Sequence, residues 1–217
     1  MFNNRTNNQN MSFTPPVVTV ITGCMFAGKT TELIEEIHDH DKNRPSENKL
    51  VVKPKRDDRY DADHIVSHNG DKYPATNISD LRDLYPILKA LGLNGVKYIF
   101  IDEAHFFPEL HEFLQSPEVH SRFITISGLN FDYQKKWFDG MKFALEMYAQ
   151  KVINLRARCS KCGSNTAQYT ARFDQDDGER IRVGGSNTYY ACCERCHPNS
   201  KSQEPQMISI GLGSNAI

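Results

Sequence analysis

The chain has 217 residues, and its 26 basic and 27 acidic side chains give a formal net charge of -1 at pH 7. This length holds one α/β domain with a smaller second unit but not two full domains. The charge balance excludes a global attraction to nucleic acid or anionic lipid, and no apolar run reaches the roughly 18 residues of a membrane span. Residues 1–10 are polar and asparagine-rich, unlike a signal peptide, so we expect a cytoplasmic protein without a membrane or nucleic-acid partner.

We expect residues 1–14 to form a disordered tail. The first ordered element is expected to be a strand rich in β-branched residues, at residues 17–21. The next segment matches G-x-x-x-x-G-K-[ST]. In such a P-loop the backbone amides converge on phosphate oxygens, the lysine supplies a mobile positive charge and the threonine hydroxyl binds Mg²⁺. A glycine turn that merely precedes a helix is the competing interpretation, but the strand in front favours a nucleoside triphosphate site. The residues of this P-loop are Gly23, Cys24, Met25, Phe26, Ala27, Gly28, Lys29 and Thr30.

Strand-like and helix-like patterns then alternate along the chain. This alternation predicts an α/β fold, a P-loop parallel sheet flanked by helices, over residues 15–156. The segment between residues 53 and 77 is charged and polar, and we expect an exposed loop there. The expected strands are residues 17–21, 50–52, 97–101, 123–127 and 151–155, the last of them a core strand. The expected helices are residues 30–41, 78–91, 109–115 and 138–149.

Two adjacent acids follow the apolar strand at residues 97–101. Asp102 stands where a P-loop fold places the carboxylate that holds Mg²⁺, and Glu103 is a candidate general base. The competing interpretation is that both acids only cap the following helix. Asp102-Glu103-Ala104-His105 also spells the DEAH tetrad of one helicase class. We rank a nucleic-acid motor low, because no second motor-sized domain follows and the net charge is near zero.

Cysteine pairs near the C-terminus indicate a metal site. Cys159 and Cys162 form one C-x-x-C pair, and Cys193 and Cys196 form another. This spacing predicts a structural zinc ribbon at residues 157–197, with a flexible tail at residues 198–217. Four unligated thiols are the alternative. The second pair is flanked by Cys192 and His197, so the exact ligand set stays open, and we expect Cys192 to be a bystander.

The insert between the two cysteine pairs has features of a small-molecule site. It contains β-prone pieces at residues 168–173 and 180–183, a glycine pair and an aromatic side chain. The glycine pair offers backbone amides, and the aromatic ring offers a lid. A nucleic-acid-binding ribbon is the alternative, but acidic side chains in the insert would repel phosphates. The residues of interest are Thr170, Arg172, Val183, Gly184, Gly185 and Tyr189.

Taken in order, these residues resemble the type II thymidine kinases, deoxynucleoside kinases with a P-loop core and a zinc-held lasso. The resemblance covers about residues 17–197. It includes the P-loop, the two acids and both cysteine pairs. The further matching motifs are Asp57-Asp58-Arg59-Tyr60, Phe106-Phe107-Pro108, Gly128-Leu129, Asp132-Tyr133, Thr170-x-Arg172, Gly184-Gly185 and Tyr189.

The resemblance implies transfer of the ATP γ-phosphoryl group to the 5′-hydroxyl of thymidine, with Glu103 as catalytic base. It also implies a homotetramer and feedback inhibition by dTTP. The residues expected around ATP and Mg²⁺ are those of the P-loop with Asp57, Asp58, Arg59, Asp102, Glu103, Ala104 and His105. The residues expected around thymidine are Met25, Phe106, Leu129, Tyr133, Thr170, Ile181, Arg182, Val183, Gly184, Gly185 and Tyr189. A zinc-ribbon nucleic-acid-dependent ATPase and a non-catalytic nucleotide-sensing module remain as alternatives.

Overall fold

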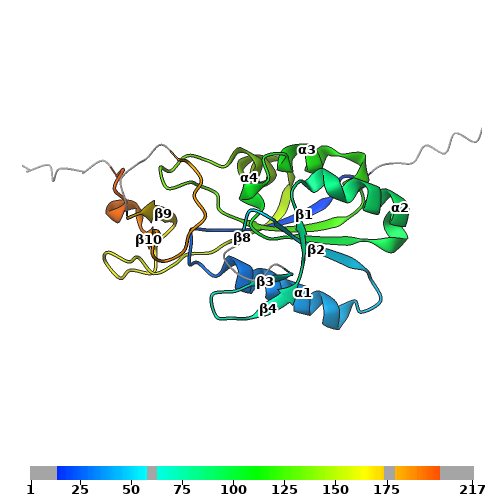
Figure 1. Ribbon diagram of the computed structural model, residues 1–217, viewed down its shortest axis with the longest axis horizontal. Coiled ribbons are helices and arrows are strands. Elements are labelled where there is room, and N and C mark those ends of the chain that lie inside the picture. Colours follow the sequence, from blue (N-terminus) through cyan, green and yellow to red (C-terminus); the bar gives the residue numbers. More distant parts are fainter. Residues whose placement is uncertain (1–13, 58–62, 174–178, 201–217) are drawn as a thin grey trace, which may run out of the picture.

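A computed structural model describes residues 14–57, 63–173 and 179–200. A six-stranded sheet with the order β5-β2-β6-β7-β1-β8 forms the centre of the molecule, and every neighbouring pair is parallel. Figure 1 shows α2, α3 and α4 on one side of this sheet and α1 on the other. This arrangement confirms the predicted α/β class. The strands are β1 (Val17–Thr22), β2 (Lys49–Pro54), β5 (Thr76–Ile78), β6 (Tyr98–Ile101), β7 (Phe123–Gly128) and β8 (Ala149–Asn154).

Alternating side chains of the strands supply two separate apolar layers, as the period of two in a strand requires. Val18 and Val20 point to one face, where they pack with α2 (Tyr85–Gly95), α3 (Leu110–Gln115) and α4 (Asp139–Phe143). Ile21 points to the opposite face and packs with α1 (Lys29–Asn43). The P-loop connects the end of β1 to the start of α1, so the strand and the helix hold its two ends.

The predicted strand at residues 151–155 forms as β8, but the prediction that it lies in the core is wrong. β8 pairs only with β1 and forms an edge of the sheet, and its side chains are mostly exposed, with Val152 at 49%. Its sequence is apolar enough for a strand but does not reveal which strand lies at the edge. No helix among the described residues is long and apolar enough to cross a membrane.

The segment between residues 53 and 77 is not a simple loop. It contains the antiparallel hairpin of β3 (His64–Val66) and β4 (Lys72–Pro74), followed by β5 at the second edge of the sheet. Ile65 anchors the hairpin, because its side chain is 1% exposed and packs in the apolar layer beneath α1. Strands of three residues are too short to show a periodic pattern.

Two predicted helices are shorter and less regular than expected. Ile78 belongs to β5, and the following helical segment starts as a 3₁₀ turn, Leu81–Leu84, before α2. Farther along, α4 is only five residues long and passes into a π-helical turn, Ala144–Tyr148, which leads into β8. The predicted helix at residues 109–115 is confirmed as α3, beginning one residue later.

A small two-stranded sheet lies at one end of the molecule, on the left in Figure 1. It pairs β9 (Tyr169–Arg172) with β10 (Tyr189–Cys192) in antiparallel register. The predicted β-prone piece at residues 168–173 becomes β9. Residues 180–183 form no strand, and β10 was not predicted. We refer to residues 157–197 as the C-terminal unit and to residues 179–188 as the lasso segment.

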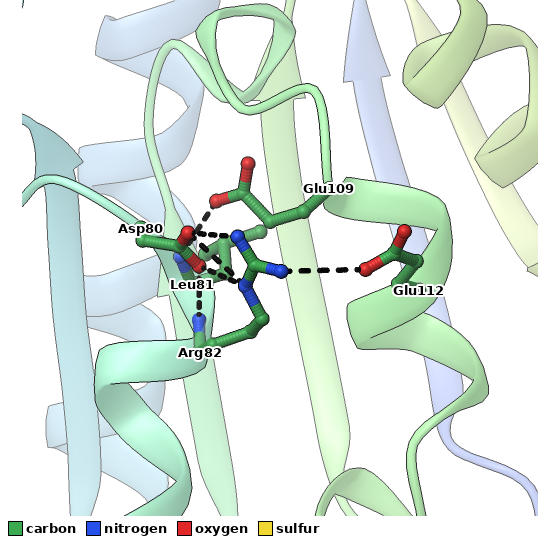
Figure 2. A network of polar contacts seen from close by, with 5 residues as sticks. All are labelled: Asp80, Leu81, Arg82, Glu109 and Glu112. Carbon is green, nitrogen blue, oxygen red and sulfur yellow. Dashed lines mark hydrogen bonds and ion pairs between the residues drawn. The ribbon is translucent and has the colours of Figure 1, made fainter.

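A polar network joins the start of the 3₁₀ turn to α3 (Figure 2). The Asp80 carboxylate caps the turn by accepting a hydrogen bond from the Arg82 amide at 2.8 Å. Arg82 also contacts Glu112 on α3 at 3.8 Å. The Glu109 carboxylate accepts a hydrogen bond from the buried Leu81 amide at 2.7 Å. Glu109 therefore fixes the position of the 3₁₀ turn against α3.

We expect Glu109→Ala to lower the free energy of unfolding by about 1–3 kcal/mol, because the buried Leu81 amide loses its acceptor. Glu109→Gln keeps an amide oxygen and is expected to lose less. Glu112→Ala is the matched control, since it breaks only an exposed ion pair worth about 0–1 kcal/mol. Urea unfolding of the three variants measures these differences. Equal losses for Glu109→Ala and Glu112→Ala would contradict this role of Glu109.

Candidate functional site

The P-loop occupies the turn between β1 and α1, at the carboxyl edge of the sheet. Three of its residues have positive φ angles: Gly23 at 147°, Phe26 at 66° and Gly28 at 87°. A side chain at Gly23 would place its Cβ only 2.4 Å from the Leu155 carbonyl oxygen. Gly23 is therefore required by the close approach of the chain after β8, and Gly28 by the left-handed backbone that precedes α1.

Lys29 and Thr30 open α1, where the helix dipole favours an anion. The Lys29 ammonium is buried and donates a hydrogen bond to the Cys24 carbonyl at 2.9 Å, so the side chain folds back over the loop. The Thr30 hydroxyl lies 3.2 and 3.4 Å from the two carboxylate oxygens of Asp102. P-loop proteins hold Mg²⁺ with a hydroxyl and a nearby carboxylate, so these residues fit the predicted ion.

The two predicted acids lie where β6 ends. Asp102 is 4% exposed, and burial together with the negative charge of Glu103 raises the pKa of Asp102 to about 7. Glu103 adopts a left-handed backbone, with φ at 47° and ψ at 40°, and a 3₁₀ turn, Ala104–Phe106, follows it. This conformation is uncommon for a residue with a side chain and breaks the strand sharply. Both acids line the same cleft as Lys29.

His105 borders the same cleft and lies beside Glu103. Its Nδ1 accepts a hydrogen bond from the Leu129 amide at 3.3 Å and lies 3.4 Å from a Glu103 carboxylate oxygen. Its ring packs against Phe106 and Phe138, with centroids 4.3 and 4.9 Å apart. His105 thereby connects the turn after β6 to the chain after β7.

One continuous cleft extends from the P-loop to the lasso segment and contains about 1040 Å³ of space, part of it open to solvent. Charged and hydroxyl groups line one end, and apolar and aromatic side chains line the other. The expected site residues that border it are Met25, Phe26, Gly28, Lys29, Thr30, Asp57, Asp102, Glu103, His105, Phe106, Leu129, Tyr133, Thr170, Ile181, Arg182, Val183, Gly184 and Tyr189.

Several expected site residues do not border the cleft. Some of them shape the chain behind it: Cys24 is buried against the C-terminal unit, and Ala104 is buried in the main apolar layer. The expected residues that are absent from the cleft wall are Gly23, Cys24, Ala27, Ala104 and Gly185. Asp58 and Arg59 lie outside the described residues, so the structure gives no position for them.

The cleft also has walls that the sequence patterns did not indicate. Lys53 lies at the end of β2, whereas Ile65, Val66 and His68 come from the β3–β4 hairpin, which was predicted to be an exposed loop. The additional lining residues are Thr31, Lys53, Ile65, Val66, His68, Phe131, Asp132, Phe138 and Arg180. Asp132 was part of a matching motif, but no pattern in the sequence indicated its partner.

That partner is Arg180 of the lasso segment. The Asp132 side chain is almost fully buried, and its carboxylate accepts a hydrogen bond from Arg180 Nε at 2.8 Å. The other carboxylate oxygen accepts hydrogen bonds from the Gln134 and Lys136 amides, each at 2.9 Å. A buried carboxylate with three donors is firmly placed. It therefore anchors the lasso segment to the chain after β7.

Two further contacts close the lasso segment over the cleft. The Tyr189 hydroxyl donates a hydrogen bond to the Arg182 carbonyl at 2.8 Å, and Arg56 donates one to the Ile181 carbonyl at 3.2 Å. Both contacts use backbone carbonyls. They fix the path of the lasso segment whatever side chains those two positions carry.

The four predicted cysteine ligands converge in the C-terminal unit. The sulfur atoms of Cys159, Cys162, Cys193 and Cys196 all lie within 4.8 Å of one another, and those of Cys162 and Cys193 are 3.8 Å apart. Tetrahedral zinc with Zn–S bonds of about 2.3 Å separates its sulfurs by about 3.8 Å, so the cluster fits this ion. Burial acts to raise the pKa of Cys159, but hydrogen bonds from the Cys162, Cys193 and Lys161 amides outweigh it and lower the pKa to about 6.

Neither neighbouring candidate belongs to this cluster. The Cys192 thiol points to the Tyr169 carbonyl at 3.7 Å, and burial raises its pKa to about 12, which disfavours the thiolate that a metal needs. His197 Nδ1 accepts a hydrogen bond from the Asn199 amide at 3.0 Å. The four-sulfur set is therefore complete without them.

We expect Asp102→Asn to stabilise the protein without added magnesium by on the order of 1 kcal/mol or more at pH 8. The folded state raises the pKa of this carboxyl to about 7, so ionising it costs stability. That cost is absent below about pH 4, where the carboxyl is protonated in both states, and grows until about pH 7. Urea unfolding between pH 4 and pH 8 measures it. A stability difference that does not change with pH would contradict the burial of an ionised Asp102.

Comparison with known proteins identifies the family of this chain. A sequence model of the family described as thymidine kinase matches residues 17–197. The chain is 34% identical over 185 residues to a thymidine kinase of Pyrobaculum aerophilum, covering 82% of this chain and 97% of that protein. For the thymidine kinase of Mycoplasma mobile the identity is 32%, with 90% and 94% covered. A rice thymidine kinase is 31% identical, and the match covers 83% of this chain but 66% of the rice protein. The chain belongs to the thymidine kinase family.

Proposed function

We propose that this protein transfers the γ-phosphoryl group of ATP to the 5′-hydroxyl of thymidine, forming dTMP for nucleotide salvage. The observation that carries the proposal is the single cleft that joins the P-loop and the two acids to an aromatic chamber under the lasso segment. A triphosphate at one end and a nucleoside at the other would meet beside Glu103. Family membership supports the same reaction.

In this reaction Glu103 accepts the proton of the 5′-hydroxyl while the 5′-oxygen forms a bond to the γ-phosphorus. The bond between that phosphorus and the β,γ-bridging oxygen breaks, and ADP leaves. Lys29 and the P-loop amides hold the phosphates, and Thr30 with Asp102 would hold Mg²⁺, which neutralises phosphate charge when bound. Phosphoryl transfer demands chiefly positioning and charge stabilisation, which these residues are suited to supply.

The aromatic end of the cleft suits a pyrimidine base. Phe106, Leu129 and Tyr133 supply apolar walls, and the lasso segment around Val183 supplies backbone hydrogen-bonding groups. A thymine ring needs a narrow apolar slot with a few fixed polar partners. Because contacts to the Ile181 and Arg182 carbonyls hold the lasso segment, these partners are pre-positioned.

Other parts of the proposal rest on family membership and on the chemistry of the cysteines. We infer that the four-cysteine cluster holds a structural zinc, because it leaves no open coordination position. Cysteines that bind zinc must stay reduced, which favours the cytoplasm as the compartment. We also propose that the protein is a homotetramer. We propose further that dTTP, the end product, inhibits it by spanning both ends of the cleft.

Incubation with Mg-ATP and labelled deoxynucleosides tests the proposal. We expect thymidine 5′-phosphate to form and ATP hydrolysis to be unaffected by single- or double-stranded nucleic acid. Polynucleotide-stimulated ATP hydrolysis without a nucleotide product would instead identify a zinc-ribbon ATPase. Binding of ATP and thymidine without turnover would identify a sensing module.

The role of Glu103 is tested by Glu103→Gln. We expect kcat to fall by on the order of 10²-fold or more, with Mg-ATP binding retained, because the amide cannot accept the 5′-hydroxyl proton. Glu112→Gln is the matched control, since its side chain is 54% exposed on α3. A Glu103→Gln variant with the kcat of the wild type would remove Glu103 from the role of base.

The metal assignment is tested by Cys159→Ala. We expect this variant to lose stoichiometric zinc and to unfold at a lower temperature, because metal binding energy contributes to the folding of small cysteine-rich units. Cys192→Ala is the matched control, because its thiol lies outside the four-sulfur cluster. Zinc analysis by mass spectrometry separates the two variants. Equal zinc content in Cys159→Ala and the wild type would defeat the assignment.

A further inference from the structure

The P-loop contacts the C-terminal unit through hydrogen bonds as well as through packing. The Met25 amide donates a hydrogen bond to the Thr170 hydroxyl at 3.0 Å, and both groups are buried. Next to it, the Cys24 thiol donates to the Ala167 carbonyl at 3.4 Å. Two consecutive P-loop residues are therefore tied to the chain at and before β9.

Apolar contacts surround these hydrogen bonds. Cys24 belongs to one buried cluster with Cys159, Cys193 and Ala167, and Phe26 and Ala27 pack against it. Three of the metal-ligand cysteines, with Cys196 packed against the cluster as well, thus share a small core with three residues of the P-loop.

Thr170 occupies a well-fixed position in the C-terminal unit. It pairs with Ala191 of β10, and β10 leads directly to Cys193. The Thr170 side chain is 3% exposed and borders the cleft. Its hydroxyl faces the P-loop amide, so its methyl group is the part left to contact a nucleoside. One side chain is thereby placed between both ends of the cleft.

We propose that Thr170 is a positioning residue for the triphosphate site, whose hydroxyl fixes the P-loop by holding the Met25 amide. This rests on the proposed function, in that the ligand of the P-loop is taken to be Mg-ATP. The Met25 amide is committed to Thr170, which leaves the amides of the following residues to converge on phosphate. The C-terminal unit therefore does more than cover the nucleoside, because it also sets the shape of the loop that binds the donor.

Two substitutions at Thr170 separate the effect of its hydroxyl from the effect of its methyl group. Thr170→Val keeps the shape but removes the acceptor, leaving a buried amide without a partner. Thr170→Ser keeps the acceptor and removes the methyl group. Calorimetric titration with a non-hydrolysable Mg-ATP analogue, without nucleoside, is expected to give a Kd about 10-fold higher for Thr170→Val and within about twofold of the wild type for Thr170→Ser. The KM for thymidine is expected to rise in Thr170→Ser.

Hydrogen exchange at the Met25 amide gives a readout that a general loss of stability would not mimic. We expect faster exchange at this amide in Thr170→Val than in Thr170→Ser, with equal zinc content and similar exchange in β9 and β10. If Thr170→Val does not fold, Thr170→Ala removes the same hydroxyl together with the methyl group. Equal Kd values for the wild type and the hydroxyl-free variant, or equal weakening by valine and serine, would overturn the inference.

The same titration distinguishes this inference from the proposed function. A wild-type protein that does not bind the Mg-ATP analogue would overturn both. A wild type that binds it, together with a hydroxyl-free variant that binds it equally well, would overturn only the role of Thr170.

Discussion

The backbone of the P-loop is the constraint on which the rest of the site depends. Amides can converge on one phosphate only if the chain turns tightly between β1 and α1, and three residues of this turn have positive φ angles. Phe26 is not a glycine, so its left-handed conformation costs on the order of 1 kcal/mol or more. Such a turn persists only when its surroundings hold it. Here the strand, the helix, the chain after β8 and the C-terminal unit all do so.

At the same edge of the sheet, the buried Asp102 carboxyl lowers the stability of the folded protein. A carboxyl group that is buried beside another acid is poorly placed for the stability of the protein alone, and its raised pKa expresses this. A bound cation would remove that penalty, since it supplies the missing positive charge. The protein thus keeps an unfavourable group where the proposed reaction needs one, a pattern typical of active sites. Packing of both faces of the sheet supplies the stability that makes this possible.

Sequence patterns predicted the parts of the structure that are set by local spacing. The P-loop, the acids after β6 and the cysteine pairs each occupy a few consecutive residues, and their chemistry can be read without the fold. The exposed edge position of β8 and the hairpin around Ile65 could not be predicted, because tertiary contacts decide them. The ion pair between Arg180 and Asp132 joins residues 48 positions apart, so no local pattern reveals it. The bond between Thr170 and Met25 was missed for the same reason.

We propose that one cleft brings the γ-phosphate and the nucleoside 5′-hydroxyl together at Glu103. A crystal structure of the complex with thymidine, Mg²⁺ and a non-hydrolysable ATP analogue tests it most directly. We predict that the thymidine 5′-oxygen lies about 2.6–3.2 Å from a Glu103 carboxylate oxygen and faces the γ-phosphorus, with the base beneath the lasso segment. A nucleoside bound elsewhere, or a 5′-oxygen beyond hydrogen-bond reach of Glu103 in the ternary complex, would contradict it.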